Sequence, residues 1–451
     1  MMAYMETKAE MHIGYIGLGA MGGQLARRVL AANSLTVWDL NREAVGEFKK
    51  LGASVAASAA EVARQCEIVV VCLPRSADVR QVIFGPDGVA EGLSAGMLLI
   101  DQTSGIPAET GRIAAELAQR GVAMIDAPVS GNPAIVPAGR HTVLASGPDE
   151  AYERALPILR TLSPNLFRCG NRIGDGQAVK IVNNALNACT RLALLEVVAM
   201  GRKLGLSLET ITDVINQGSG RCHPSLMMLT ALIEGRSWSN FGLALQLKDV
   251  TQAIYLGFEC GTPMPIANIA RGLLQIGVNI FGKDARLADV VPLIEQLAGT
   301  RLAESPAAPG NAHVANLLDS VMADCNRVIA YECAALAFKF GLNLSAMASA
   351  INKSSGWSIA FERIMPELAS GVQTATIPLG ERAEQLKEAS EMAFGCGAPM
   401  LIANAVGAIF ATGVNSLGAE ANVDELVRLF EHAAGIKFPG SRDFTENREE
   451  R

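Results

Sequence analysis

The sequence predicts an α/β domain with a mostly parallel, doubly wound sheet, followed by an all-α domain that is present in two tandem copies. Three observations lead to this prediction. Unbroken apolar segments of strand length alternate with helical patterns in the first part of the chain, the later pattern is helical almost to the end, and that helical part repeats itself at a fixed spacing. We expect the limits 11–172 for the α/β domain, 173–303 and 310–437 for the two helical copies, and 438–451 for a tail.

Composition narrows the class of protein. With 451 residues, half of them hydrophobic and only 5% aromatic, the chain is long enough for two or three domains with a large core. A net charge of −7 without a basic tract disfavours nucleic acid as a partner, and no apolar run has the length of a membrane span or the character of a signal peptide. The nine cysteines show no CxxC spacing and the five histidines are dispersed. This favours buried thiols in a reducing, cytoplasmic compartment over disulfides or a metal site.

The first strand pattern, His12–Ile16, runs directly into a glycine-rich turn and then a helical pattern, 23–32. A second strand pattern, Thr36–Trp38, ends at Asp39. This order of strand, glycine turn, helix, strand and acid is the context in which a GxGxxG motif binds a dinucleotide, with the pyrophosphate at the helix N-terminus. The residues of the turn, all expected to contact the cofactor, are Gly17, Leu18, Gly19, Ala20, Met21 and Gly22.

Asp39 favours NAD over NADP as the cofactor. Its carboxylate can accept hydrogen bonds from the adenosine ribose hydroxyls and would repel a 2′-phosphate. Asn41 and Arg42 follow and could meet that phosphate, so NADP stays open as an alternative. Another alternative is a glycine turn that only allows close helix packing and holds no cofactor.

Further strand patterns alternate with helices after Asp39. They are Ile68–Leu73, Met97–Ile100, Ala123–Ile125 and Thr142–Ser146. Unbroken apolar strands separated by helices indicate a parallel sheet that is covered on both faces, and such sheets bind ligands beyond the carboxyl ends of their strands. The residues that follow strand ends here include Pro74, Ser104, Ser130 and Gly131.

A long helical pattern, Gln177–Leu204, follows the α/β domain and carries the residues at which we place the chemistry. It would span roughly 40 Å, enough to link two domains. Lys180 and Asn184 lie one turn apart on one face, so both side chains can touch the same ligand. Asp175 can cap this helix, and Gly176 lets another chain or a ligand approach its first turn. The alternative is a lysine whose stem packs while its ammonium reaches solvent.

The helical part contains an internal repeat. A stretch rich in proline, alanine and glycine, 304–312, separates the two copies. Matching residues lie 136 positions apart without a gap: Gly205 and Gly341, Asn216 and Asn352, Gly220 and Gly356, Cys260 and Cys396, and Gly277 and Gly413.

The second copy keeps the glycines and packing residues but replaces the reactive side chains. At a spacing of 136 residues, Lys180 corresponds to Asn316, Asn184 to Ser320 and Lys248 to Glu384. We therefore expect the chemistry in the first copy and buried surface from the second.

Several motifs, in order, resemble those of the β-hydroxyacid dehydrogenase family, the 3-hydroxyisobutyrate and tartronate-semialdehyde reductase type. The resemblance covers about residues 12–300, and Ser-Gly-Arg-Cys at 219–222 is similar to the 3-hydroxyisobutyrate branch in particular. It implies a Rossmann domain and an all-α domain that often pairs with a second subunit. Here the second copy is expected to provide that pairing, an arrangement similar to 6-phosphogluconate dehydrogenase, although that enzyme's SGG-containing substrate motif is missing. The matching motifs are GYIGLGAMG (14–22), CLP (72–74), DQTSGIP (101–107), DAPVSG (126–131), GDGQAVKIVNN (174–184) and LQLKD (245–249).

The resemblance implies a role for each matched residue. Lys180 is the general acid/base, and Asn184 orients the substrate. Asn132, where the family has a glycine, and Arg140-His141 depart from the pattern and are expected to narrow or re-polarise the carboxylate pocket. The substrate carboxylate is expected at Ser130, Gly131 and Asn132, and the cofactor at the glycine turn, Asp39, Leu73, Pro74, Ser104 and Lys248.

The resemblance thus predicts an NAD(P)-dependent oxidoreductase that interconverts a small β-hydroxy acid and its semialdehyde or keto form. In the oxidative direction Lys180 takes the hydroxyl proton while hydride leaves the same carbon for the nicotinamide. Three alternatives remain. They are a reductase of a different carbonyl or imine substrate on the same scaffold, a non-catalytic NAD-binding sensor, and a structural or interaction protein that uses the duplicated helices for dimerisation. The last gives no reason for Lys180, Asn184 and Lys248 to occur together. We expect either a monomer with an internal pseudo-dimer or a homodimer.

Overall fold

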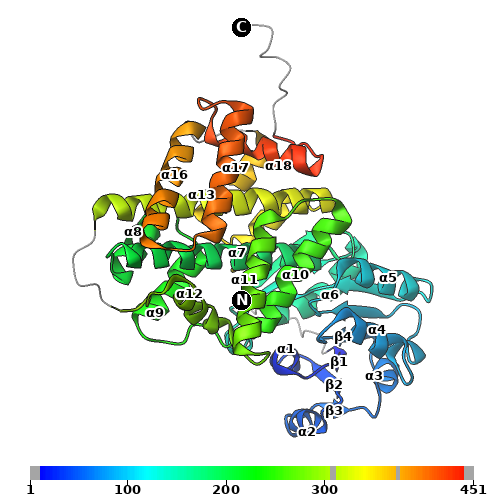
Figure 1. The fold of residues 1–451 in the computed structure, drawn as a ribbon. Coiled ribbons are helices and arrows are strands. Elements are labelled where there is room, and N and C mark those ends of the chain that lie inside the picture. The colour runs from blue at the N-terminus through cyan, green and yellow to red at the C-terminus, as the bar shows by residue number, and fades with distance from the viewer. Residues whose placement is uncertain (1–10, 305–310, 372–375, 441–451) are drawn as a thin grey trace, which may run out of the picture. The chain divides into compact units, whose positions relative to one another are not determined.

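The computed structural model describes residues 11–304, 311–371 and 376–440 (Figure 1). The chain divides into two compact units, 1–180 and 181–451. The predicted stretch between the helical copies, 304–312, and the predicted tail, 438–451, lie largely outside the described residues. The chain is packed through Phe438, whose side chain is 1% exposed. The predicted domain limits stay predictions.

The first unit is built on one nine-stranded sheet, in the blue and cyan part of Figure 1. Its strands are β1 (His12–Ile16), β2 (Ser34–Trp38), β3 (Ser54–Val55), β4 (Ile68–Val71), β5 (Leu98–Asp101), β6 (Ala123–Asp126), β7 (Val129–Ser130), β8 (Thr142–Ser146) and β9 (Asn165–Gly170). The order is β3-β2-β1-β4-β5-β6-β8-β7, with β9 beside β8. The strands from β3 to β6 are parallel, whereas β8 is antiparallel to β6 and β7. The predicted mostly parallel sheet is confirmed.

Helices cover both faces of this sheet. They are α1 (Ala20–Leu30), α2 (Arg42–Lys50), α3 (Ala59–Gln65), α4 (Ser76–Phe84), η1 (Val89–Glu91), α5 (Pro107–Ala118), η2 (Pro133–Ile135) and α6 (Asp149–Leu162). One apolar core joins Tyr15 of β1 to α1 and α6, and the other joins its neighbour Ile16 to α3, α4 and α5. Because successive strand residues point to opposite faces, both faces need apolar side chains. This explains the unbroken apolar strands and confirms the doubly wound prediction.

The second unit is all-helical. It begins within α7 (Asp175–Lys203) and continues with α8 (Leu208–Gln217), η3 (Ser225–Leu229), α9 (Thr230–Ile233), α10 (Leu243–Cys260), α11 (Pro265–Phe281), η4 (Leu287–Asp289), α12 (Val290–Ala298), α13 (Ala312–Phe340), α14 (Leu344–Ile351), α15 (Ile359–Ser370), α16 (Leu379–Cys396), α17 (Leu401–Leu417), η5 (Val423–Leu426) and α18 (Val427–Ala434). The pairs α10 and α16, and α11 and α17, begin and end 136 residues apart. The predicted duplication is therefore confirmed in the structure.

The two copies meet through equivalent residues. Cys222 forms an isolated antiparallel bridge with Ser358, its equivalent in the other copy. The backbone N–H of His223 donates to the carbonyl of Trp357 at 2.9 Å, and the N–H of Ile359 donates to that of Arg221 at 3.0 Å. Such reciprocal contacts define a twofold relation. The duplication has thus produced an internal pseudo-dimer.

Each long helix also caps a helix of the other copy. The Glu196 carboxylate of α7 accepts from the N–H of Ile402 at 2.9 Å, at the start of α17. Its equivalent in α13, Glu332, accepts from the N–H of Ile266 at 2.9 Å, at the start of α11. Burial raises the pKa of Glu196 to about 8 and that of Glu332 to about 7. These two equivalent capping contacts stabilise the interface between the copies.

Within the described residues, the helices lack the combination of length and apolarity that crossing a membrane requires.

Candidate active site

The turn between β1 and α1 leaves room for a ligand. Gly17 has a φ of +98°, and a Cβ added there would lie 2.2 Å from the Cys72 carbonyl oxygen. A Cβ on Gly22 would lie 2.1 Å from the Gly17 carbonyl oxygen, so α1 can pack this closely only on glycine. A Cβ on Gly19, by contrast, would meet nothing within 4 Å, and no side chain caps the start of α1. These properties fit a pyrophosphate at this helix N-terminus.

Asp39 lies beside this turn, at the end of β2. Its carboxylate accepts from the backbone N–H of Leu18 at 2.5 Å and from that of Asn41 at 2.7 Å. The Asn41 side chain caps α2 by accepting from the N–H of Glu43 at 3.0 Å, so it already has a structural partner. Arg42 is exposed. The carboxylate thus lies beside the glycine turn, as is expected of a ribose-binding acid in this kind of unit.

Two buried carboxyl groups mark the ends of β5 and β6. Burial raises the pKa of Asp101 to about 7 and that of Asp126 to about 6. Asp126 accepts from the N–H of Gly174 at 2.8 Å and from that of Gln177 at 2.9 Å. These are amides of the first turn of α7, so Asp126 fixes where that helix begins.

The Gln177 side chain ties α7 to the loop after β5. Its Oε1 accepts from Thr110 Oγ1 at 2.9 Å, and its Nε2 donates to the Thr103 carbonyl at 3.3 Å. Ser104 follows Thr103, and Lys180 lies three residues after Gln177 on the same face of the helix. This brings the predicted residues Ser104 and Lys180 together.

Lys180 Nζ donates a hydrogen bond to Ser104 Oγ, and both residues are half-buried. The ammonium is also close enough to Cys72 to lower the pKa of that thiol, although burial has the larger effect and raises it to about 12. Cys72 is the residue that contacts the glycine turn at Gly17. Within the first unit, a lysine therefore lies at the carboxyl ends of β4 and β5, on the ligand-binding edge of the sheet.

The predicted carboxylate loop follows β7 in the same unit. Ser130 is half-buried and pairs with Thr142 of β8, and Gly131 is exposed with a φ of +140°. The Asn132 side chain turns back to cap η2, accepting from the N–H of Ala134 at 3.0 Å.

The histidine that departs from the family pattern lies behind this loop. A Cβ added to Gly131 would lie 3.1 Å from the Cβ of His141, whose side chain is fully buried, while Arg140 is exposed. Neither ring nitrogen of His141 has a hydrogen-bond partner among the described residues. Burial, helped by the charge of Arg28, lowers the pKa of His141 to about 4, so the ring is neutral near pH 7.

Asn184 and Lys248 belong to the second unit, where one acid connects them. Asn184 Nδ2 donates to Asp249 Oδ2 at 2.9 Å, and Lys248 Nζ lies 3.3 Å from Asp249 Oδ1. The sequence reasoning gave Asp249 no role. Its position next to Lys248 in the LQLKD motif was the available signal.

Two predictions about the start of α7 were wrong. Asp175 does not act as the predicted cap, because it pairs with Arg172 at 2.8 Å and Asp126 takes the helix amides. A Cβ on Gly176 would lie 2.3 Å from the Leu144 carbonyl oxygen, so this glycine admits strand β8 of the same unit and not a ligand. Asp126 and Leu144 both lie far from this helix in the sequence, so local patterns could not indicate them.

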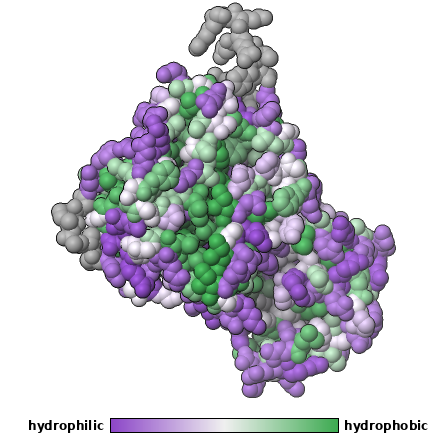
Figure 2. Space-filling model, viewed as in Figure 1, coloured by the Kyte–Doolittle hydropathy of each residue, from purple (hydrophilic) through white to green (hydrophobic). Residues whose placement is uncertain are grey.

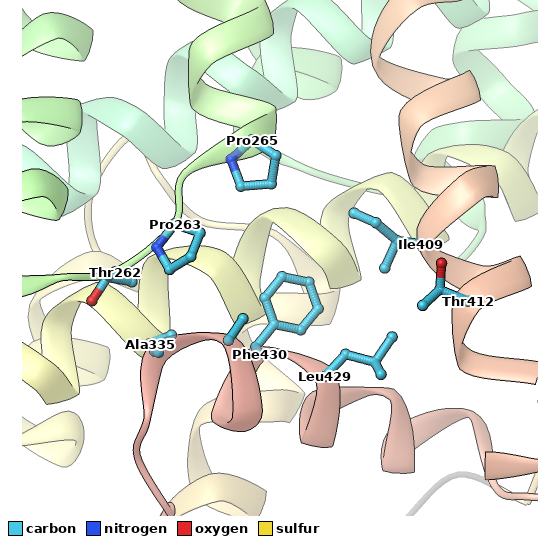
Figure 3. A pocket seen from close by; sticks show the side chains of 10 residues that line it. Thr262, Pro263, Pro265, Ala335, Ile409, Thr412, Leu429 and Phe430 are labelled. Atoms are coloured by element: carbon cyan, nitrogen blue, oxygen red, sulfur yellow. The ribbon is translucent and has the colours of Figure 1, made fainter. Parts of the chain in front are cut away.

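An apolar pocket of about 200 Å³ lies elsewhere in the second unit (Figure 3). Its walls include Pro265, Thr412 and Ala433. The equivalent residues on the other side of the pseudo-dimer are larger, namely Leu401, Ile276 and Leu297, and they are 46%, 43% and 40% exposed. Figure 2 shows an apolar area over α11, α12 and α17, the helices that carry them. The pocket thus results from smaller side chains and contains none of the predicted site residues.

Comparisons with known proteins agree with this arrangement. The family model described as the NAD binding domain of 6-phosphogluconate dehydrogenase matches residues 12–170. The model described as the NAD-binding domain of NADP-dependent 3-hydroxyisobutyrate dehydrogenase matches twice, at 174–294 and 310–430. The 2-(hydroxymethyl)glutarate dehydrogenase of Eubacterium barkeri is 31% identical, over 64% of this chain and 96% of its own length.

Two solved structures extend the comparison. The 3-hydroxyisobutyrate dehydrogenase of Salmonella typhimurium is 30% identical with a TM-score of 0.54, over 62% of this chain and 98% of its own. The 6-phosphogluconate dehydrogenase of Plasmodium falciparum is 16% identical with a TM-score of 0.68, and it covers 90% of this chain and 93% of its own, which shows a shared fold. With the family models matching both parts of the chain, this protein belongs to the 3-hydroxyisobutyrate dehydrogenase-like family of NAD(P)-dependent β-hydroxyacid dehydrogenases.

Proposed function

We propose that this chain oxidises a small β-hydroxy acid to its semialdehyde with NAD, and that Lys180 is the general acid/base. The observation that carries the proposal is the hydrogen bond from Lys180 Nζ to Ser104 Oγ. It lies at the carboxyl ends of the strands, the edge of the sheet that also carries the glycine turn between β1 and α1. A lysine with a hydroxyl partner at that edge is suited to move a proton beside a bound nicotinamide.

The cofactor would be held mainly by the first unit. The amides at the start of α1 would bind the pyrophosphate, and the Asp39 carboxylate would accept hydrogen bonds from the ribose hydroxyls. Leu73, Pro74 and Ser104 would contact the nicotinamide half, and Lys248 is a further predicted cofactor-binding residue. NAD, when bound, accepts a hydride from the carbon that carries the substrate hydroxyl. Asp39→Ala should raise the Km for NAD and lower that for NADP, and unchanged values for both would remove Asp39 from cofactor selection.

The substrate would be oriented by its carboxylate. Ser130, Gly131 and Asn132 form a short loop in which Gly131 is exposed, and this loop would bind that group. Asn184 would orient the hydroxyl-bearing carbon. In oxidation the Lys180 amine takes the hydroxyl proton, the C–H bond gives up hydride, and a carbonyl forms on the same carbon. Ser104 Oγ holds the resulting ammonium in place.

The names of two relatives support the proposed substrate class. The names of the Eubacterium and Salmonella enzymes describe acids in which the hydroxyl-bearing carbon lies one carbon away from the carbon that bears the carboxylate. We propose an acid of this kind for the present chain, which would act as a monomer because its second helical copy supplies the pairing surface.

A substrate screen tests the proposal. Purified protein is mixed with NAD or NADP and a panel of 3-hydroxy acids, 2-hydroxy acids and primary alcohols, and NAD(P)H is followed at 340 nm. We expect turnover confined to 3-hydroxy acids and faster with NAD. A parallel assay supplies cyclic imines with NADH or NADPH. Turnover in that assay alone would favour an imine reductase, and NAD binding without turnover in either assay would favour a sensor.

A further inference from the structure

One turn of the second helical copy contacts the residues that surround Asn184. This turn, 354–357, connects α14 to α15. We propose that Ser355 and Gly356 of this turn position the Asn184 amide through Asn183, so that the copy without reactive groups completes the one active site of the chain. The inference rests on the proposed function, which gives Asn184 the task of orienting the substrate.

Asn183 is the link between the turn and Asn184. Its side chain is fully buried. Its Oδ1 accepts from the backbone N–H of Gly356 at 2.8 Å, and its Nδ2 donates to Ser355 Oγ at 3.1 Å. The same Nδ2 donates to Asn184 Oδ1 at 3.2 Å. One amide therefore contacts the second copy on one side and Asn184 on the other.

These bonds determine which way the Asn184 amide faces. Its oxygen accepts from Asn183, and its nitrogen donates to Asp249 Oδ2 at 2.9 Å. Turning the amide over would place its oxygen against the Asp249 carboxylate and its nitrogen against the Asn183 donor, which loses both hydrogen bonds. One N–H and one lone pair of Asn184 then keep a fixed direction for a substrate.

The turn is held against α7 at further points. A Cβ on Gly356 would lie 2.9 Å from both the backbone and the side-chain oxygen of Asn183, so only glycine allows this approach. The Ser355 carbonyl accepts from Asn187 Nδ2 at 2.6 Å. Asn187 in turn accepts from Arg191, which lies over the Trp238 ring at 5.2 Å. The turn is thus held on α7 by hydrogen bonds to both Asn183 and Asn187.

The equivalent contact on the other side of the pseudo-dimer shows what is special here. There, Gly220 of the first copy donates its N–H to Asp319 Oδ1 at 2.8 Å, and Ser219 Oγ donates to Asp319 Oδ2 at 3.1 Å. Asp319 is the equivalent of Asn183, and Ser320 that of Asn184. A carboxylate can only accept, so it cannot pass a hydrogen bond on to residue 320.

Both contacts therefore contain the hydrogen bonds that join the two copies. They differ in the hydrogen bond to the next residue of the helix, which only Asn183 can donate. If the turn served only to join the copies, an aspartate would serve at residue 183 as it does at residue 319. Of the two equivalent residues, only Asn183 donates a hydrogen bond to the residue that follows it. Asn183 lies on α7, the helix that carries Lys180 and Asn184. This asymmetry assigns the Ser355, Gly356 and Asn183 group to positioning.

A reciprocal exchange tests the proposal in the full-length protein. Asn183→Asp keeps the acceptors for Gly356 and Ser355 but removes the donor, and it leaves Asn184 between two carboxylates. We expect kcat/KM for the best 3-hydroxy acid to fall roughly tenfold, the effect of one buried hydrogen bond left unmade, while the Kd for NAD stays unchanged. The matched control, Asp319→Asn, should stay within twofold of wild type. Equal effects of the two variants, or wild-type kcat/KM in Asn183→Asp, would overturn the proposal.

A second pair of variants separates positioning from folding. Ser355→Ala and Ser219→Ala remove equivalent hydroxyls, so we expect similar shifts in Tm but a lower kcat/KM, by roughly threefold, only in Ser355→Ala. If neither variant changes kcat/KM, the role of the turn is structural and the proposal fails.

The failure of the proposed function can be recognised separately. Wild-type protein that turns over no hydroxy acid would contradict that function, and crystal structures of wild type and Asn183→Asp would then decide on positioning. We expect a single Asn184 conformer bound to Asp249 in wild type and a displaced Asn184 in the variant. An unchanged Asn184 in the variant would refute the inference.

Discussion

Removing the Asp126 carboxylate should loosen the start of α7, which carries Lys180. In Asp126→Ala, three donors lose their acceptor: the N–H groups of Gly174 and Gln177 and the hydroxyl of Ser146. At about 1 kcal/mol for each hydrogen bond, the free energy of unfolding of the first unit falls by roughly 3 kcal/mol. For a unit of this size each kcal/mol lowers Tm by about 2–4 °C, so we expect a drop of about 10 °C.

Differential scanning calorimetry measures this drop, and steady-state kinetics measure the accompanying loss of kcat. Asp78→Ala serves as the control, because the Asp78 carboxylate forms a surface pair with Arg75 at 3.0 Å whose loss should cost less than about 1 kcal/mol. An Asp126→Ala protein with a Tm within 2 °C of wild type would refute the idea that this carboxylate holds the first turn of α7.

Two further predictions concern His141 and the apolar pocket. Because burial lowers the pKa of His141 to about 4, the neutral ring is favoured in the folded state. Its contribution is complete above pH 6.5 and is lost as the pH falls towards 4, by roughly 3 kcal/mol. His141→Leu should flatten the dependence of Tm on pH between 4 and 6.5, and an undiminished dependence would contradict this origin. Ala433→Leu introduces the residue found at the equivalent Leu297. Because the new side chain fills part of the apolar pocket, it should raise the free energy of unfolding by about 0.5–2 kcal/mol and raise Tm with it, whereas a lower Tm would show that the pocket walls cannot accept the larger side chain.

The features that could be predicted from the sequence depend on residues close together in the chain. The glycine turn and Asp39 lie within one strand, turn, helix and strand unit, so their order alone indicated a nucleotide site. The duplication was visible in the sequence because the matching residues of the two copies keep a constant spacing of 136 residues, with no gap. The strands that were not predicted, β3, β7 and β9, are very short or only half-buried, so they lack the apolar runs of the central strands.

The features that could not be predicted depend on distant partners. Asp126 lies 51 residues before Gln177, and no local pattern connects an acid at the end of a strand with the amides of a later helix. The same holds for the turn at Ser355, which lies 172 residues after Asn183. From the sequence, this turn could have packed on the helix of its own copy or on that of the other, because both copies carry the same glycine. Only the three-dimensional arrangement shows that it crosses to α7.

The central claim is that the Lys180 amine moves the substrate proton, and the kcat of Lys180→Ala tests it most directly. We expect kcat for the best 3-hydroxy acid to fall by roughly 10²–10⁴-fold, the usual loss for a general acid/base, with the Kd for NAD within twofold of wild type. Asn316→Ala, at the equivalent and exposed position of the second copy, should leave kcat unchanged. Turnover of Lys180→Ala near the wild-type rate would contradict the account.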